Sequence, residues 1–154
     1  MNGGLEAGSL ANWRDGRNFS VTNQALYSGK YGAKMLNNGQ IYQNFRTVAG
    51  KTYYVSAGVR IDKQIVAPSN GGLLVSVRTS WGWGKDLARS PYLTLSNSPA
   101  GTWSQVNFSF VARTTMSTIV FHVDGNGHFE ASADDFIVSP NPIPNSYAIL
   151  TATH

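Results

Sequence analysis

The chain has 154 residues, which is the size of a single domain with a substantial buried core. Charged residues make up 13% of it, about half of the usual ~25%, and basic residues are too scattered to form a nucleic-acid binding surface. The absence of cysteine excludes disulfides and thiolate metal sites, and no apolar stretch approaches the ~18 residues that a membrane-spanning helix needs.

The chain opens on a glycine-rich segment, 2–8, whose single carboxylate is Glu6. Near the other end, Asp134 and Asp135 stand immediately before an apolar, β-prone run. Two such segments meet if the first and last strands are neighbours in a sheet. Hard oxygen ligands brought together in that way suit calcium, so we expect a structural calcium here.

Between these ends the hydrophobic pattern is that of short β-strands. They are predicted at 41–47, 52–61, 73–79, 92–96, 104–112, 117–123 and 134–138. Clusters of Gly, Pro, Asn and Ser separate these segments, and no window has the period of a long amphipathic helix. The sequence therefore predicts an all-β fold, a two-sheet β-sandwich with jelly-roll topology.

Alternation within the strands predicts which side chains face the core. Because a one-residue slip would expose a whole apolar set, the sets that contain Val55, Val75 and Phe121 are assigned to the interior. The opposite faces of the same three strands carry basic side chains, and a fourth strand adds two polar ones: Arg60, Arg78, His122, Tyr42 and Asn44. Such a face is either ordinary solvated surface or the floor of a cleft.

The segment 80–85, Ser-Trp-Gly-Trp-Gly-Lys, places two tryptophans between glycines in a loop with little local core to fill. Aromatic rings match the flat C–H faces of sugar rings, and planar hydrogen-bonding groups match the hydroxyls at their edges. Residues 85–92 extend this loop and would wall a cleft. The alternative is that one indole closes an open end of the sandwich. The predicted carbohydrate-binding residues are Trp81, Trp83, Arg78, Arg60, His122, Tyr42, Asn44 and Lys85.

The tail after Val138 has three prolines within five residues and cannot continue a central strand. We therefore divide the chain into a β-sandwich module, 2–139, and a proline-rich linker or tail to a neighbouring module, 140–154. A linker implies that the domain belongs to a longer modular protein.

Several motifs in chain order resemble the carbohydrate-binding modules grouped as families four, nine, sixteen and twenty-two. They are Asn-Gly-Gly-Leu-Glu-x-Gly at 2–8, Trp13, Tyr-Ser-Gly-Lys-Tyr at 27–31, Val-Ala-Gly-Lys-Thr-Tyr at 48–53, Gly-Thr-Trp at 101–103 and Asp-Asp-Phe at 134–136. Each motif is short and unspecific, and the ordered series over 2–139 carries the resemblance.

The resemblance implies a jelly-roll sandwich with a structural calcium and a sugar-binding cleft, usually appended to a secreted glycoside hydrolase or polysaccharide lyase. Its calcium ligands would be the carboxylates of Glu6 and Asp134, the carbonyl of Gly4 and carbonyls near Ser28 and Tyr31. Some members have an acidic residue where Ser28 stands, so the ligand there must be main-chain oxygen or water. Alternatively, Glu6 and Asp134 only cap turns.

Catalysis is not expected, because glycoside hydrolysis needs two carboxyls that flank the scissile bond. Glu6 and the Asp134–Asp135 pair are already assigned to one end of the fold, and Asp62 and Asp124 end strands as turn residues. The histidines lack zinc-site spacing, and the serines lack a nucleophile elbow. Two alternatives remain, namely a lyase-like or hydrolase sandwich enzyme that uses the arginines with a His or Tyr base, and a structural or adhesive cell-surface sandwich.

The expected partners are a polysaccharide or oligosaccharide and a catalytic module in the same parent chain, with no nucleic acid and no membrane. We expect a secreted or extracellular monomer. The net charge of +4 slightly favours a uronate-containing polymer, while neutral glucan, mannan or xylan suits the aromatic residues equally well.

Overall fold

The structure is a computed structural model that describes residues 14–15, 19–22, 32–35, 40–79, 86–142 and 149–151. Within these ranges every regular element is a β-strand. A search of the same residues finds no helix with the length and apolar character needed to cross a membrane.

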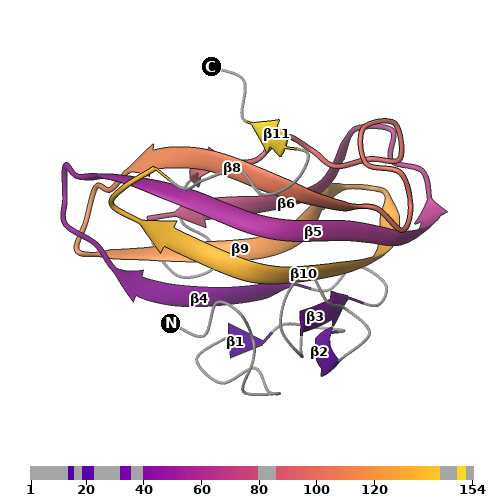
Figure 1. Cartoon of the computed structure of the whole chain (residues 1–154), viewed down its shortest axis with the longest axis horizontal. Helices are drawn as coiled ribbons and strands as arrows, with labels where there is room; N and C mark the ends of the chain where they lie inside the picture. Colours follow the sequence, from indigo (N-terminus) through magenta and orange to yellow (C-terminus); the bar gives the residue numbers. More distant parts are fainter. Residues whose placement is uncertain are drawn as a thin grey trace.

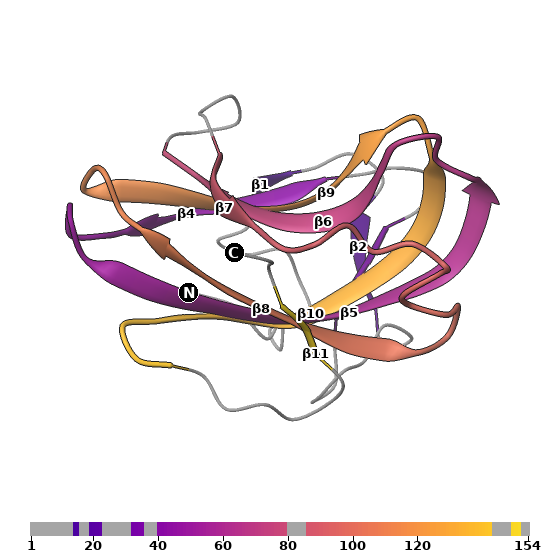
Figure 2. The same ribbon diagram turned by 90° about the horizontal axis from the view of Figure 1, so that it is seen from above.

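The strands form two sheets that lie face to face as the layers of a sandwich (Figures 1 and 2). Sheet A has the order β1 (Arg14–Asp15), β4 (Ile41–Arg46), β9 (Met116–Gly125), β6 (Gly71–Arg78) and β7 (Asp86–Arg89). Sheet B has the order β11 (Ile149–Thr151), β8 (Trp103–Val111), β5 (Thr52–Val66), β10 (His128–Ser139), β3 (Gly32–Met35) and β2 (Phe19–Thr22). The chain crosses between the two sheets several times, and the predicted all-β sandwich is confirmed.

The core lies between the layers, and alternation predicted its members correctly. Val55 and Val59 on β5, Val75 on β6 and Ile119 and Phe121 on β9 are fully buried. Their neighbours in sequence point the other way because successive strand residues alternate between the two faces. Once the core residues of a strand are known, the residues between them are therefore assigned to the outward face of its sheet.

One predicted strand, 92–96, is wrong, and the apolar pattern did not reveal β1, β2, β3, β7, β11 or residues 128–133 of β10. Leu93 makes only an isolated bridge to Leu73, while Asp86–Arg89 pairs with β6 at the edge of sheet A. The reason is local side-chain hydrogen bonding. Asn97 accepts a bond from the Thr94 N–H at 3.0 Å and donates to the Tyr92 carbonyl at 2.8 Å, which holds the chain in a turn instead of a ladder.

A β-bulge interrupts the pairing of β10 with β5. Asp134 lies opposite Gly58 and Ile137 opposite Ser56, so β10 has one extra residue between these pairs. Asp135 takes up the insertion in the left-handed region, with φ 57°, a conformation that Asp and Asn tolerate better than most residues. The bulge turns Phe136 into the core, where its ring centroid lies 6.3 Å from that of Phe121.

The tail contributes β11, which pairs in parallel with β8, whereas the other described pairings are antiparallel. Residues 143–148 lie outside the described part of the chain. The division into a module at 2–139 and a linker or tail at 140–154 stays a prediction.

Candidate functional site

The strand register gathers four of the predicted site residues on the outward face of sheet A. Tyr42 lies opposite Val120, and both Asn44 and Arg78 lie opposite Thr118. Directly opposed residues point to the same side of a sheet, and His122 lies on this side because its neighbour Phe121 points inward. These four predicted site residues therefore share one face of sheet A, as expected, and their part in a binding cleft stays a prediction.

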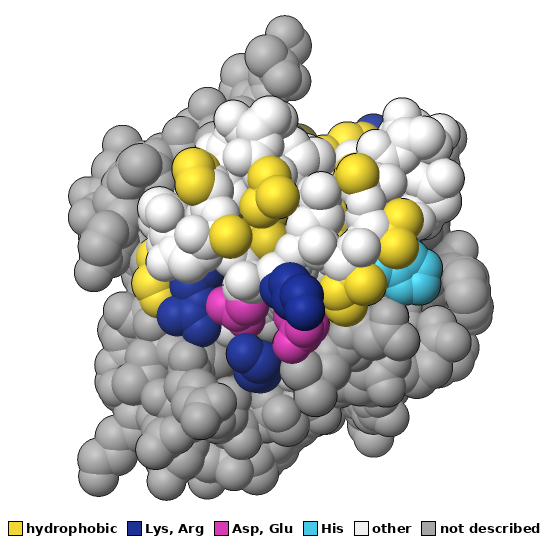
Figure 3. Space-filling view, turned by 90° about the vertical axis from the view of Figure 1, so that its right-hand side faces the viewer, with side chains coloured by type: hydrophobic (Ala, Val, Ile, Leu, Met, Phe, Trp, Pro, Cys, Tyr) yellow, Lys and Arg dark blue, Asp and Glu magenta, His cyan; other side chains and the backbone are white. Residues whose placement is uncertain are grey.

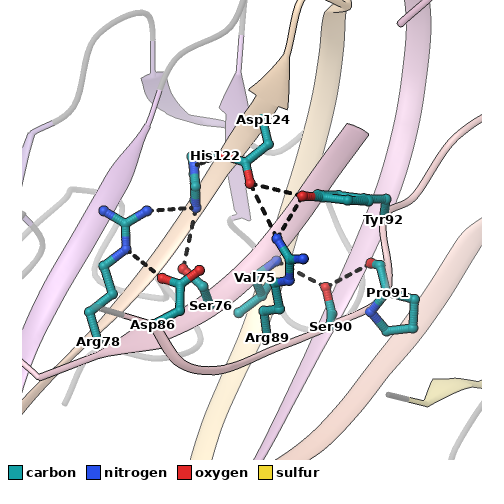
Figure 4. Close-up of polar contacts among 10 residues, drawn as sticks. All are labelled: Val75, Ser76, Arg78, Asp86, Arg89, Ser90, Pro91, Tyr92, His122 and Asp124. Atoms are coloured by element: carbon teal, nitrogen blue, oxygen red, sulfur yellow. Dashed lines mark hydrogen bonds and ion pairs between the residues drawn. The ribbon is translucent and has the colours of Figure 1, made fainter. Parts of the chain in front are cut away.

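His122 is the centre of a hydrogen-bonded group on this face (Figure 4). Its Nε2 lies 3.2 Å from the Ser76 hydroxyl and 3.4 Å from Nη2 of Arg78, and its Nδ1 lies 3.6 Å from Oδ1 of Asp124. The imidazole is almost completely buried, with 7% of its surface exposed, and Ser76 is fully buried.

An ion pair lies on each side of His122 (Figure 4). Arg78 Nε donates to Oδ1 of Asp86 at 2.9 Å, and Nη1 of Arg89 lies 3.5 Å from Oδ2 of Asp124. The two arginines and two aspartates balance, so this part of the face has no net charge while His122 is neutral.

Tyr92 closes the network at the Asp124 end. Its hydroxyl accepts a hydrogen bond from Nη1 of Arg89 at 2.6 Å and donates one to Oδ2 of Asp124 at 3.1 Å. The Arg89 guanidinium also lies over the tyrosine ring, 4.8 Å from its centroid. The ring is half-buried.

The environment of His122 disfavours its charged form. Burial is the largest cause and the Arg78 charge the next, and together they lower the pKa of His122, although Asp124 and Asp86 act in the opposite direction. The imidazole is therefore neutral at neutral pH.

Arg60 does not belong to this face, and its prediction is corrected here. It lies on β5 in sheet B, where Nε donates to Oδ1 of Asp62 at 2.5 Å and Nη2 to the Ser132 hydroxyl at 3.2 Å. Its guanidinium lies over the Trp103 ring, 4.8 Å from the centroid, and Lys34 joins the group through Asp62 at 3.4 Å. Alternation assigned the correct face of the strand, but it does not say to which sheet a strand belongs.

Oppositely charged side chains also lie beside one another at one end of the sandwich (Figure 3). Figure 3 looks at the end that lies to the right in Figure 1, where Lys and Arg side chains lie directly beside Asp and Glu side chains. On this described surface the hydrophobic side chains form small separate groups rather than one broad patch.

A hollow of about 450 Å³ continues the outward face of sheet A beyond Asn44. It is lined by Arg46 and Thr47 at the end of β4 and by Thr115 and Met116 at the start of β9. Arg46 lies opposite Met116, one step along the face from the Asn44–Thr118 pair. The polar face thus runs from Tyr92 and Asp124 at one end to this hollow at the other.

Seven predicted site residues lie outside the described residues: Trp81, Trp83, Lys85, Gly4, Glu6, Ser28 and Tyr31. The two positions that flank residues 80–85 are described. Thr79 follows Arg78 at the end of β6, and Asp86 begins β7 and pairs with Arg78. The described residues on both sides of 80–85 therefore lie at the end of the face that carries the Arg78–Asp86 ion pair.

Asp134, the remaining predicted metal ligand, is fully buried at the β10 bulge. Its Oδ1 accepts a hydrogen bond from the Asp135 N–H at 2.8 Å. Its neighbour Ala133 pairs with Ala33, so Asp134 lies on the strand beside β3. Among the described residues there is no group of three acidic or histidine side chains that would hold a metal, and the calcium site stays a prediction.

Sequence reasoning assigned Asp124 only to a turn and missed its place in the network. The signal was present, because Asp124 follows His122 by two positions in one strand and so shares its face. Asp86, Arg89 and Tyr92 come from the segment expected to wall a cleft; Asp86 pairs with Arg78, and Arg89 and Tyr92 contact Asp124.

No family model and no curated protein matches this chain. Solved structures do match it. A family 61 carbohydrate-binding module in complex with β-1,4-galactotriose has a TM-score of 0.60 at 18% identity, covering 90% of this chain and 94% of that one. A family 16 carbohydrate-binding module has a TM-score of 0.63 at 16% identity, with coverages of 90% and 96%.

The chain has the fold of a carbohydrate-binding module. A third match is the family 22 module joined to a GH10 module in the endo-1,4-β-D-xylanase 10B of Clostridium thermocellum, complexed with xylohexaose. Its TM-score is 0.61 at 16% identity, and the match covers 88% of this chain and 27% of that one. The resemblance to families sixteen and twenty-two is thus confirmed at the level of the fold.

Proposed function

We propose that this chain is a non-catalytic carbohydrate-binding module that binds a polysaccharide along the outward face of sheet A. The observation that carries the proposal is the hydrogen-bonded row of Asp86, Arg78, His122, Asp124 and Tyr92 on a sheet of this fold. Trp81 and Trp83, in the segment that joins β6 to β7, would supply the stacking surfaces at one end.

The face suits an extended glycan chain in both chemistry and length. Arginine donors, aspartate acceptors and a tyrosine hydroxyl are the groups that pair with sugar hydroxyls, and the Tyr92 ring adds an apolar surface. From Met116 to Asp124 the face follows β9 for eight residue steps, which corresponds to roughly 27 Å of strand. Thr118 and Val120 in the middle of this face are buried, whereas Met116 and Asp124 at its ends are accessible. A ligand of several sugar units would therefore contact the face at these ends.

The charge balance favours a neutral polysaccharide. Arg78 and Arg89 are each paired with an aspartate on this face, and Arg60 and Lys34 are paired with Asp62 on the other sheet. An acidic polymer would have to compete with these internal partners for the guanidinium groups. A neutral glucan, mannan, xylan or galactan brings no carboxylate to break these ion pairs.

We further propose that the module is secreted and holds a polysaccharide-degrading catalytic module of the same parent chain on its substrate, and that it is monomeric. The family 22 module that shares this fold is joined to a GH10 module in a xylanase, and the proline-rich segment after Val138 suits a linker.

A structural calcium held by Asp134 with Glu6, Gly4, Ser28 and Tyr31 is part of the proposal. Carboxylate and carbonyl oxygens are the ligands that calcium prefers, and Asp134 places a carboxylate at the bulge of β10. Chelation with EDTA should lower the melting temperature by ligand linkage, and added Ca²⁺ should restore it. The Asp134→Asn variant should lose this response and Glu130→Gln should keep it; identical melts with and without EDTA would refute the metal assignment.

The function is tested by affinity electrophoresis and calorimetry against a glycan panel that includes xylohexaose, β-1,4-galactotriose, β-glucan, mannan and a polyuronate. We expect dissociation constants of roughly millimolar to micromolar. Trp81→Ala, Trp83→Ala and Arg78→Ala should each weaken binding about tenfold or more, with folding checked by circular dichroism.

Arg60→Ala is the matched control, because it removes an arginine from the opposite sheet and should leave the affinity unchanged. Unaltered binding in both tryptophan variants would place the site elsewhere. New reducing or unsaturated ends during incubation would indicate an enzyme, and the absence of binding to every glycan would support a structural sandwich.

A further inference from the structure

The contacts of His122 fix its tautomer. Arginine has only donors, so the Nε2 atom that faces Nη2 of Arg78 at 3.4 Å must present its lone pair. The Ser76 hydroxyl, 3.2 Å from the same nitrogen, also donates to it. The ring proton of the neutral imidazole is then on Nδ1, on the side of the Asp124 carboxylate.

We propose that His122 is a positioning residue that makes glycan binding dependent on pH. Its neutral ring holds Arg78 in the binding geometry on the outward face of sheet A, and protonation of Nε2 releases Arg78 and weakens glycan binding. The proposal rests on the proposed function, since it concerns the regulation of that same site.

Protonation turns Nε2 of His122 from a hydrogen-bond acceptor into a donor. The Arg78 guanidinium and the Ser76 hydroxyl already donate to this nitrogen. A proton on Nε2 would point at the Arg78 guanidinium, and a second positive charge would lie 3.4 Å from the first. Arg78 keeps its other anchor, the 2.9 Å bond from Nε to Asp86, so it can turn away from the ring without leaving the sheet. The Ser76 hydroxyl can rotate to accept instead, which leaves Arg78 as the group that must move.

The charged and titratable groups around the imidazole decide at which pH His122 is protonated. Those on the same face come from each strand beside His122: Arg78 on β6, Asp86 and Arg89 on β7, Tyr92 after β7, Asp124 on β9 and Tyr42 on β4. Burial and Arg78 outweigh the two aspartates and lower the pKa of His122. Release is therefore expected at pH values below the ordinary ~6.5 of histidine.

A measurement without ligand tests directly whether the neutral His122 ring holds Arg78. Long-range ¹⁵N spectra of the imidazole at pH 7.5 should show Nδ1 protonated and Nε2 unprotonated in His122. As the pH is lowered until the His122 ring is protonated, the side-chain signal of Arg78 should change with the same midpoint as the ring. A proton on Nε2 at pH 7.5, or an Arg78 signal that ignores the His122 titration, would overturn the proposal.

The second arm measures binding of the tightest glycan from the panel between pH 7.5 and 5. Wild-type affinity should fall about tenfold, as expected when one hydrogen bond to a charged group is lost, with the His122 midpoint. His122→Gln, whose side-chain oxygen can occupy the acceptor position and does not titrate, should bind with little pH dependence. His128→Gln, at an exposed position on β10, should keep the wild-type profile.

The two arms separate the failure of this proposal from that of the proposed function. If no glycan binds, the proposed function fails and the spectra still decide whether His122 holds Arg78. If a glycan binds with the same affinity at pH 5 and 7.5 while His122 titrates, the regulatory proposal fails and the module assignment stands. If His122→Gln does not fold, the wild-type spectra and binding profile decide.

Discussion

At the scale of single residues, phenylalanine rings from different strands pack against each other in the core. Phe121 on β9 is fully buried, and its ring contacts Phe136, which the β10 bulge turns inward. Because protein interiors are close-packed, removing such a ring leaves a cavity that the neighbours fill only in part.

Phe121→Ala should therefore lower the free energy of unfolding by about 3–5 kcal/mol. Val48→Ala is the comparison, because 61% of the Val48 surface is exposed and its loss should change stability by less than about 0.5 kcal/mol. Urea denaturation followed by tryptophan fluorescence measures both. Equal, small losses in the two variants would mean that Phe121 does not lie in a tightly packed core.

Single residues also mark the limit of sequence reasoning. Alternation correctly sent Val55, Val75 and Phe121 inward and Arg78 and His122 outward. It grouped Arg60 with Arg78 because both lie on polar faces, although the two belong to different sheets. The face of a residue follows from local periodicity, whereas the partner strands depend on contacts that are distant in sequence and leave no local pattern.

At the scale of elements, the chain reversals depend on glycines with positive φ. Gly125 ends β9 with φ 83°, and a Cβ there would lie 2.0 Å from the Asn70 carbonyl oxygen. Gly50, in the turn before β5, has φ 86° but nothing within 4 Å of its Cβ position. The two glycines share the backbone requirement and differ in the space around them.

Alanine substitutions should separate these two effects. Gly50→Ala should cost roughly 1–2 kcal/mol, the strain of a left-handed backbone. Gly125→Ala adds a clash with backbone and should cost more, about 3 kcal/mol or above. Chemical denaturation measures the difference, and a Gly125 variant as stable as the Gly50 variant would contradict the close approach of β9 to Asn70.

Elements were predicted well where apolar alternation was strong and poorly where side chains bond locally. The long strands β5, β8 and β9 were recognised, whereas only 134–138 was predicted of the 12-residue β10. The segment 92–96 looked like a strand, but Asn97 folds it back through bonds to Thr94 and Tyr92. β7 lacks a run of alternating hydrophobic residues and is held mainly by pairing with β6, which composition does not reveal.

At the scale of the whole molecule, the lowered pKa of His122 links stability to pH. The folded state prefers the neutral ring more than the unfolded chain does, whose histidine pKa is about 6.5. This contribution is fully present above about pH 6.5 and is lost as the pH falls through the folded-state value.

The wild-type protein should therefore lose stability between pH 7.5 and 5 more steeply than the His122→Gln variant. Urea unfolding at a series of pH values tests this, and His128→Gln serves as the control because it replaces an exposed histidine. Parallel pH profiles for wild type and His122→Gln would show that His122 is equally easy to protonate in the folded and unfolded states.

The order of strands within the two sheets has a consequence for how copies of the molecule behave together. The outermost described strands are short, with two residues in β1, four in β7, four in β2 and three in β11. The longest strands, β5 with 15 residues and β10 with 12, have neighbours on both sides. Unpaired strand borders are templates for self-association, and short ones offer few free amides to an incoming chain. The nine-residue border of β8 would be the longest such template in the described part of the fold, and Ile149–Thr151 covers part of it, so the tail of the domain helps to protect it from aggregation.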